Sequence, residues 1–92
     1  MSIVLVGGHD RMHNEYKNIG NRYGHKLKVF TQLPAKFDKI IGSPDRIVLF
    51  TSTVSHKMML AASKEAKKKN IEIIRSNSSS STSLEEIMKC LV

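Results

Sequence analysis

Three short clusters of basic, hydroxyl and glycine residues each follow an apolar, β-branched run of the sequence. Glycine lets a backbone approach a ligand closely, hydroxyls add hydrogen-bond donors, and arginine and lysine supply positive charge. Such loops at the starts of helices are typical of anion sites, because free N–H groups and the helix dipole favour negative charge. The candidate ligand-binding residues are Gly7, Gly8, His9, Arg11, Ser52, Ser55, His56, Lys57 and Arg75.

A purely structural interpretation of these clusters stays open. Gly7 and Gly8 could form only a tight turn, and Ser55 could only cap a helix. The glycine pair lacks the full spacing of a dinucleotide fingerprint, and the sequence contains no phosphate-loop lysine motif. The pattern therefore indicates a small anionic ligand, nucleotide-like or phosphorylated, and leaves the cofactor unassigned.

His9 and His56 favour an alternative chemistry, in which two neighbouring imidazoles bind a metal or haem iron or transfer a proton near neutral pH. The pair lacks a Cys or Glu at ligand spacing, and isolated histidines are more often hydrogen-bonding loop residues. Asp10 could complete a set of two histidines and one carboxylate, but it is better placed as a helix N-cap. We expect surface positions for His13 and His25.

A catalytic nucleophile has little support in the sequence. Ser52 and Ser55 lie near His56, but adjacent helix positions point in different directions, and no nucleophile elbow surrounds them. Cys90 falls on an amphipathic segment and is interpreted as a packing residue. We therefore assign no catalytic residue and expect a binding or regulatory domain rather than an enzyme.

Basic residues outnumber acidic ones by 15 to 8, which gives a formal net charge of +7 and favours anionic partners. Much of the excess lies between Lys64 and Lys69, where lysines complement the negative end of a predicted helix. This run is interpreted first as a solvated helix face and second as a surface for nucleic acid or an acidic protein. With only 2 Tyr, 3 Phe and no Trp, stacking of bases has little support.

Four strands are expected at residues 3–6, 26–30, 46–50 and 71–74, which are rich in β-branched and aliphatic residues. The first and third are almost continuously apolar, as in central strands of a parallel sheet that helices cover on both faces. The second and fourth carry charge and are expected nearer the edges.

Helices are expected between and after these strands. Met12, Tyr16, Ile19 and Tyr23 share one side of a first helix, which Gly24 can terminate in the left-handed conformation. Residues 34–42 hold at most a short helix, and its expected core residues are Phe37, Ile40 and Ile41.

Two further helices are expected in the second half of the chain. Ser55 caps one, with Met59, Ala62 and Ala66 on its buried face, and Ser83 caps a last helix, after a flexible serine-rich loop over residues 76–83. The expected buried stripe of the last helix consists of Leu84, Ile87, Met88 and Leu91.

Alternation of strands and helices predicts an α/β fold: one domain over residues 1–92, a three-layer sandwich around a four-stranded parallel sheet of order 2-1-3-4. Loops that leave the carboxyl ends of parallel strands gather at one edge, where ligands usually bind. The turns at residues 7–11 and 55–57 should therefore emerge side by side.

The bulk properties agree with a small cytoplasmic domain. A chain of 92 residues, 40% hydrophobic and 25% charged, can build one core. Its single cysteine excludes an internal disulfide and fits a reducing compartment, and the apolar start is too short for a signal peptide or membrane span. A domain this small is also expected to form a homodimer.

The chain resembles a small bacterial family known as domain of unknown function 2325. The resemblance rests on Val4-Leu5-Val6-Gly7-Gly8-His9 with Arg11, on Tyr16 and Tyr23-Gly24, on Asp45, and on Val54-Ser55-His56 followed by Lys64-Glu65-Ala66-Lys67. It departs at Thr31-Gln32-Leu33-Pro34, where the family pattern has a histidine and a glycine-containing turn. The resemblance implies a Rossmann-like fold and a site at Gly7, Gly8, His9, Arg11, Ser55 and His56, with no established activity.

Overall fold

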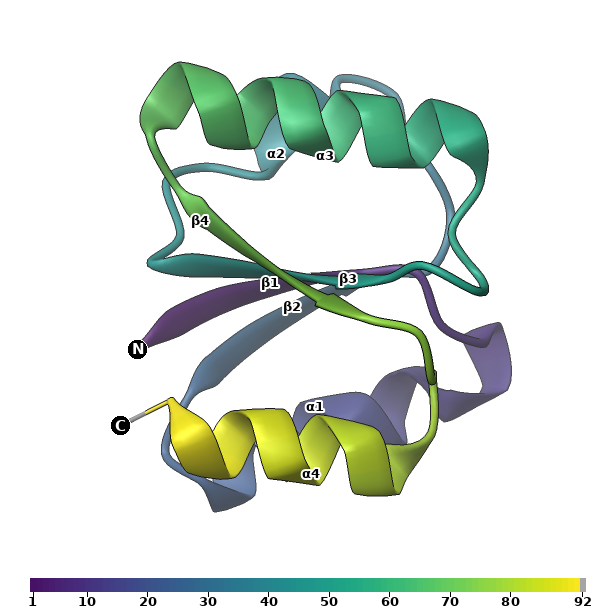
Figure 1. Cartoon of the computed structure of the whole chain (residues 1–92), viewed down its shortest axis with the longest axis vertical. Helices are drawn as coiled ribbons and strands as arrows, with labels where there is room; N and C mark the ends of the chain where they lie inside the picture. Colours follow the sequence, from purple (N-terminus) through teal and green to yellow (C-terminus); the bar gives the residue numbers. More distant parts are fainter. Residues whose placement is uncertain (92) are drawn as a thin grey trace.

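Four parallel strands form one sheet in the computed structural model, which describes residues 1–91. They are β1 (Ser2–Val6), β2 (Lys26–Phe30), β3 (Arg46–Phe50) and β4 (Glu72–Ser76), and their spatial order is β2-β1-β3-β4 (Figure 1). In the register of the sheet, Val6 of β1 aligns with Phe30 on one side and with Leu49 on the other. The predicted α/β fold class and strand order are confirmed.

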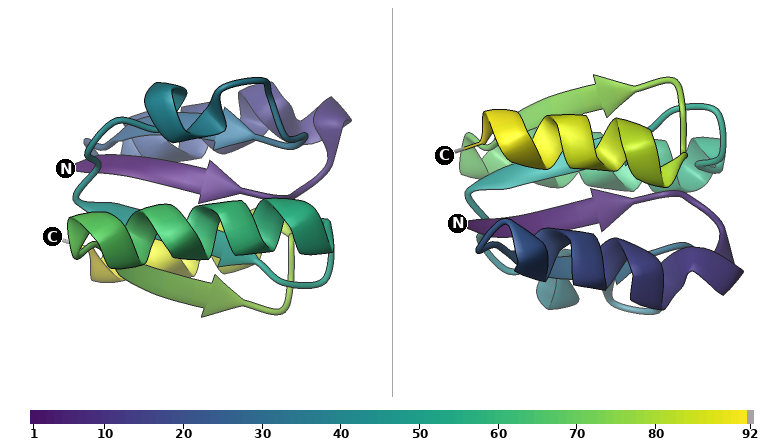
Figure 2. Two further views of the ribbon diagram at one scale, coloured as in Figure 1. Left: turned by 90° about the horizontal axis from the view of Figure 1, so that it is seen from above. Right: turned by 90° about the horizontal axis from the view of Figure 1, so that it is seen from below.

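Helices cover both faces of this sheet and make the three layers. Helices α1 (His13–Arg22) and α4 (Ser81–Cys90) lie on one face, while α2 (Phe37–Ile40) and α3 (His56–Lys69) lie on the other (Figure 2). A short 3-10 turn, η1 (Asp10–Met12), precedes α1. Residues 3–6 and 47–50 are at most 1% exposed, as expected for central strands that are buried on both faces.

The first helix buries the residues that the sequence predicted, but His25, which follows its C-terminal turn, does not lie at the surface as expected. Tyr16 and Ile19 are buried against the sheet, and Gly24 has the predicted positive φ, +77°. His25, expected at the surface, is only 6% exposed. The amide of His25 donates to the carbonyl of Gly20 at 2.9 Å, and this reversal brings its imidazole Nε2 to 3.2 Å from the carbonyl of Met88 in α4.

The third helix begins as predicted. The Ser55 hydroxyl accepts a hydrogen bond from the Met58 amide at 3.2 Å and so caps the helix. Met58, rather than Met59, leads the buried stripe with Ala62 and Ala66, because positions four apart lie on one helix face.

β4 begins one residue later than predicted, because Ile71, expected to start the strand, is hydrogen-bonded to the end of α3. The amide of Ile71 donates to the carbonyl of Ala66 at 2.8 Å and closes the helix, so the strand starts at Glu72 and continues to Ser76.

The N-cap of the last helix lies three residues before the predicted one. Ser80, not Ser83, is the N-cap, and its hydroxyl accepts from the Ser83 amide at 3.2 Å. Residues 81–83, expected in a flexible loop, therefore form the first helical turn. Leu84 and Met88 are fully buried beneath the sheet.

The single turn of α2 buries fewer residues than expected. Phe37 and Ile41 are in the core, whereas Ile40 is 43% exposed, because one turn can direct only part of its circumference at the sheet. Within residues 1–91, no helix combines the length and apolar character needed to cross a bilayer.

Gly20 of α1 has no room for a side chain. A Cβ there would lie 2.8 Å from Cβ of Leu27 in β2, closer than packed atoms allow. We expect Gly20→Ala to lower the free energy of unfolding by about 1–3 kcal/mol through overpacking, as measured by urea denaturation. The control is Asn18→Ala, an exposed position on the same helix, which should leave stability equal or slightly higher. Equal stability of the two variants would contradict this packing argument.

Candidate functional site

An open cavity of about 460 Å³ lies at the edge of the sheet where β1, β3 and β4 end. Its lining comes from all three of the loops that follow these strands. The residues are His9, Arg11 and Met12 after β1, Ser52 and Thr53 after β3, and residues 78–81 after β4. We call this the loop cavity.

The loops after β1 and β3 emerge side by side, and the contact between them is made by Thr53 rather than by the predicted residues 55–57. The Gly8 amide donates to the Thr53 hydroxyl at 2.8 Å, across 45 residues of sequence. Gly7 and Gly8 have φ of +105° and +89°, a region that side chains strongly disfavour. A Cβ on Gly8 would lie 2.6 Å from the ring of Tyr16, so glycine is required for this close approach.

Tyr16 joins these loops to the loop after β4. Its hydroxyl donates to the carbonyl of Ser79 at 2.7 Å and lies 3.4 Å from the amide of His9. Burial raises the pKa of Tyr16, which favours the neutral hydroxyl that this bond needs. The Ser79 side chain in turn lies 2.8 Å from the Thr53 hydroxyl and 3.4 Å from that of Ser52.

The N-terminal turn of α4, residues 81–83, contributes hydroxyls and no carboxylate to this region. Glu85, one turn further along, forms an ion pair with Arg22 of α1. The first amides of a helix have no intrahelical acceptor, and the helix dipole makes this end positive. The N-terminus of α4 therefore lies beside the loop cavity, as does that of α1, whose N-cap Met12 lines it.

Positive charge in the loop cavity comes from Arg11, with His9 beside it. The ion pairs within residues 1–91 are Arg22–Glu85, Arg46–Glu72 and Lys69–Glu65, so no described carboxylate neutralises Arg11. No acidic side chain of the described chain lines the cavity. Its chemistry thus suits an anion.

Asp10 is held away from the cavity by the loop after β2. Its carboxylate accepts hydrogen bonds from the hydroxyl of Thr31 and from the amide of Gln32, the latter at 2.9 Å. The expected role of Asp10 as an N-cap was wrong, since His9 is the N-cap residue of η1 and Asp10 lies inside the turn. Thr31 and Gln32 therefore support the site through Asp10.

Other predicted site residues lie elsewhere. Ser55, His56 and Lys57 begin α3 on the opposite face of the sheet, and Arg75 lies exposed in β4; none of these lines the loop cavity. Their roles in ligand binding stay predictions.

The two histidines of the alternative site do not share the loop cavity, because only His9 lines it. Within residues 1–91 no group of three or more His, Cys, Asp and Glu side chains is arranged to hold a metal ion. Metal or haem binding through His9 and His56 likewise stays a prediction.

The candidate site residues chosen from the sequence did not include Tyr16, Thr53 or residues 78–81. One signal was available for Tyr16, because a tyrosine in an apolar helical stripe must satisfy its hydroxyl inside the core. For residues 78–81, the signal was the serine-rich run itself, because it offers several possible N-cap residues for the last helix.

An open, doubly wound parallel sheet with a polar cavity at the carboxyl ends of its central strands defines a Rossmann-like α/β domain. The chain belongs to the family described as an uncharacterised protein conserved in bacteria (DUF2325), whose model matches residues 2–91. It is also similar to a de novo designed Rossmann fold protein, with a TM-score of 0.66 and 18% identity over 97% of this chain and 95% of the other. That likeness shows the fold alone. No match was found among curated proteins.

The hydroxyl of Tyr16 should stabilise the whole protein through the loops it joins. Tyr16→Phe removes the donor to the buried Ser79 carbonyl, so we expect the free energy of unfolding to fall by about 1–3 kcal/mol. Thermal and urea denaturation would measure this. Tyr23→Phe at the C-cap of the same helix is the control, because the Tyr23 hydroxyl makes no hydrogen bond within residues 1–91. Equal losses in both variants would argue against a special role for Tyr16.

The pKa of Asp10 lies below its usual value of 3.8 because Thr31, and then Gln32, donate to its charged form. A depressed folded-state pKa stabilises the fold above pH 3.8, and this contribution disappears as the pH falls through the folded-state value. We expect the NMR titration midpoint of the Asp10 carboxyl to rise in Thr31→Val, and less in Gln32→Ala. Unchanged midpoints in both variants would show that these bonds do not form in solution.

Proposed function

We propose that this protein is a binding domain that holds a small anionic ligand, phosphorylated or nucleotide-like, in the loop cavity. One observation carries the proposal: Arg11 lines the same cavity as Ser80 and Ser81, the cap and first residue of α4, and no carboxylate of residues 1–91 lines it with them. A phosphate or carboxylate group would find positive charge and free N–H donors there together.

The donors beside this cavity are already oriented. Ser80 uses its hydroxyl to hold the Ser83 amide, which leaves the amides of Ser81 and Thr82 at the open end of the helix. The Tyr16 bond to Ser79 holds the preceding residue in place. A ligand that binds here would pay little ordering entropy, since the backbone is anchored before it arrives.

The cavity volume of about 460 Å³ is in the range of small-molecule sites, which extends from roughly 300 to 1,000 Å³. Its hydroxyls favour binding over nucleophilic chemistry. Those of Ser52 and Thr53 lie beside the hydroxyl of Ser79, and neither bonds a histidine within the described residues. The proposal therefore assigns recognition, rather than a reaction, to this site.

Titration with inorganic phosphate, AMP and ADP at low ionic strength tests the proposal, with amide chemical shifts as the signal. We expect saturable shifts at residues 8–11 and 78–83. Arg11→Ala should weaken binding about tenfold or more, because it removes a charge-assisted contact.

Lys67→Ala is the matched control, because it removes a positive charge from an exposed position outside the cavity. It should change affinity by less than about twofold, as expected of a distant exposed charge. Equal weakening in both variants would indicate attraction to net charge only. Absence of saturable shifts with all three probes would overturn the proposed function.

A further inference from the structure

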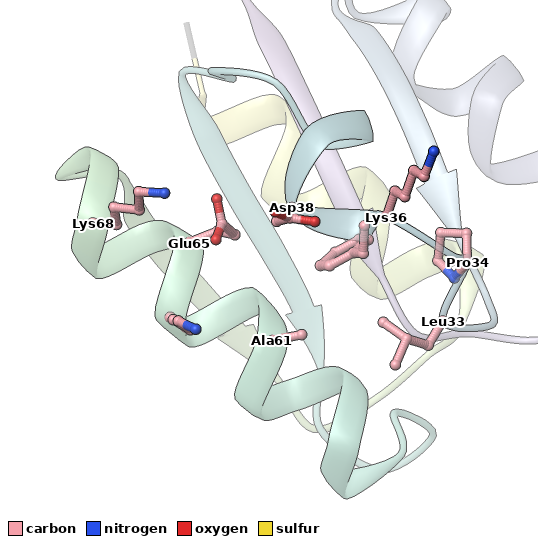
Figure 3. Close-up of a pocket in the computed structure, with 9 residues that line it drawn as sticks. Leu33, Pro34, Lys36, Asp38, Ala61, Glu65 and Lys68 are labelled. Carbon is pink, nitrogen blue, oxygen red and sulfur yellow. The ribbon is translucent and has the colours of Figure 1, made fainter.

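A second cavity of about 350 Å³ lies between α2 and α3, on the opposite face of the sheet from α1 and α4 (Figure 3). The side of α3 that carries Ala61, Lys64, Glu65 and Lys68 lines one side of it, and the other side is lined by Leu33, Pro34, Lys36, Phe37 and Asp38. It shares no lining residue with the loop cavity. We call it the α2–α3 cavity.

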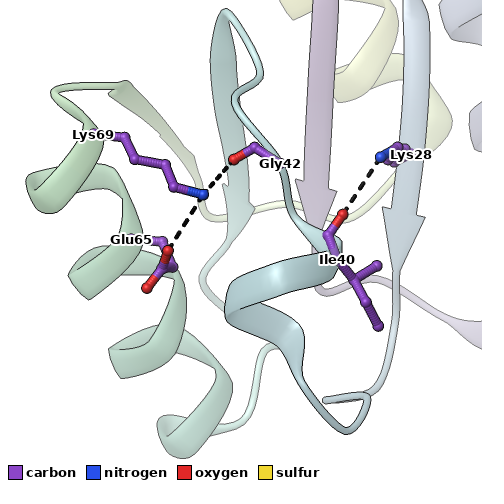
Figure 4. A network of polar contacts seen from close by, with 5 residues as sticks. All are labelled: Lys28, Ile40, Gly42, Glu65 and Lys69. Atoms are coloured by element: carbon purple, nitrogen blue, oxygen red, sulfur yellow. Dashed lines mark hydrogen bonds and ion pairs between the residues drawn. The ribbon is translucent and has the colours of Figure 1, made fainter.

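Glu65 is a buried carboxylate in the wall of this cavity. Its side chain is 5% exposed and points from α3 toward α2 (Figure 3). Its Oε1 makes no hydrogen bond within residues 1–91, and its ion pair is with Lys69, whose Nζ lies 3.4 Å away. That amine is shared, because it also donates to the carbonyl of Gly42 at 2.5 Å (Figure 4).

A buried carboxylate normally has several close donors, because removing its charge from water is costly. One ion pair of 3.4 Å to a shared amine leaves Oε1 of Glu65 with unused capacity to accept hydrogen bonds. Oε1 itself is closed off from solvent beside Lys69, so a ligand ammonium group in the α2–α3 cavity would meet the Glu65 carboxylate at its other oxygen, Oε2.

Lysines line the same cavity. Lys64 and Lys68 stand four residues apart on α3, so their like charges repel each other. Lys36 lines the cavity from the segment before α2, with its amine directed away from α3 (Figure 3). Asp38 also lines the cavity, and neither it nor any of the three lysines is in an ion pair within the described residues. A carboxylate between them would relieve this repulsion.

Apolar side chains complete the lining. Leu33 is 36% exposed, and Phe37 and Ala61 lie beside it in the wall. Phe37 is fixed by an edge-on contact with Phe30 of β2, with ring centroids 5.3 Å apart. An apolar group bound here would remove the exposed surface of Leu33 from water.

We propose that the α2–α3 cavity binds a free α-amino acid with an apolar side chain. Its ammonium group pairs with Glu65, its carboxylate lies between Lys64 and Lys68, and its side chain packs on Leu33 and Phe37. A buried acid, unpaired lysines and an apolar wall within one small cavity match the three parts of such a zwitterion. This site is independent of the anion site proposed in the loop cavity.

Titration of the full chain with L-leucine and L-phenylalanine tests the proposal, again with amide chemical shifts as the signal. We expect saturable shifts at residues 33–38 and 61–68. Analogues that lack one charged group should bind about tenfold more weakly or worse: 4-methylpentanoate has no ammonium group and L-leucinol has no carboxylate.

Glu65→Gln keeps the size of the side chain and removes its charge, so it should weaken binding about tenfold or more. Lys67→Ala, an exposed lysine of the same helix outside the lining, should change affinity by less than about twofold. Arg11→Ala should also leave amino-acid binding unchanged, which separates this site from the loop cavity.

Three results would overturn the proposal: no saturable shift with either amino acid, equal binding of the analogues, or unchanged affinity in a folded Glu65→Gln variant. If Glu65→Gln does not fold, the analogue series on the unmodified protein decides between the two outcomes.

Discussion

Both faces of β1 and β3 are sealed from water, and the rest of the molecule is arranged to keep them so. Residues 3–6 and 47–50 present aliphatic or aromatic side chains alternately to the two faces, so a helix layer on only one face would leave half of them exposed. The chain therefore leaves β1 toward one face and β3 toward the other. Right-handed crossovers in these two directions place β1 and β3 at the centre of the sheet. The loops that follow β1 and β3 then diverge toward opposite faces, which opens a crevice between them. The loop cavity lies at this edge of the sheet because of the same demand.

Sealing the core also imposes a polar requirement, which Tyr16 makes visible. A phenol buried under the first loop must find an acceptor, and it finds the carbonyl of Ser79, 63 residues away. The loop above it can come close enough only because Gly8 has no side chain. Ser79 then contacts the hydroxyls of the loop after β3. The hydrogen bond that the buried Tyr16 hydroxyl requires thus holds the three loops together and fixes the residue just before the N-cap of α4.

The two cavities differ in charge because different neighbours surround them. The loop cavity combines Arg11 with a helix N-terminus, and its nearest acid, Asp10, is turned toward Thr31 and Gln32. The α2–α3 cavity instead contains the buried carboxylate of Glu65, and Asp38 and lysines line it as well. The net charge of +7 describes neither environment, since it sums over both and over the solvated lysines of α3. Local desolvation and pairing determine what each cavity can bind.

The sequence by itself determined the elements whose signals are local. Apolar runs identified β2 and β3 within their observed bounds, the continuous burial of two strands implied the order 2-1-3-4, and Ser55 marked the start of α3. Tertiary structure decided the rest. Several serines were possible caps for α4, and Ser80 was selected by contacts of its neighbour Ser79 with residues distant in sequence. His25 became buried and Ile40 exposed through the neighbours that the fold brought to each. Which helix begins at the loop cavity likewise depends on the face of the sheet that each helix covers. Residue spacing carries only short-range information, whereas burial and pairing depend on the whole chain.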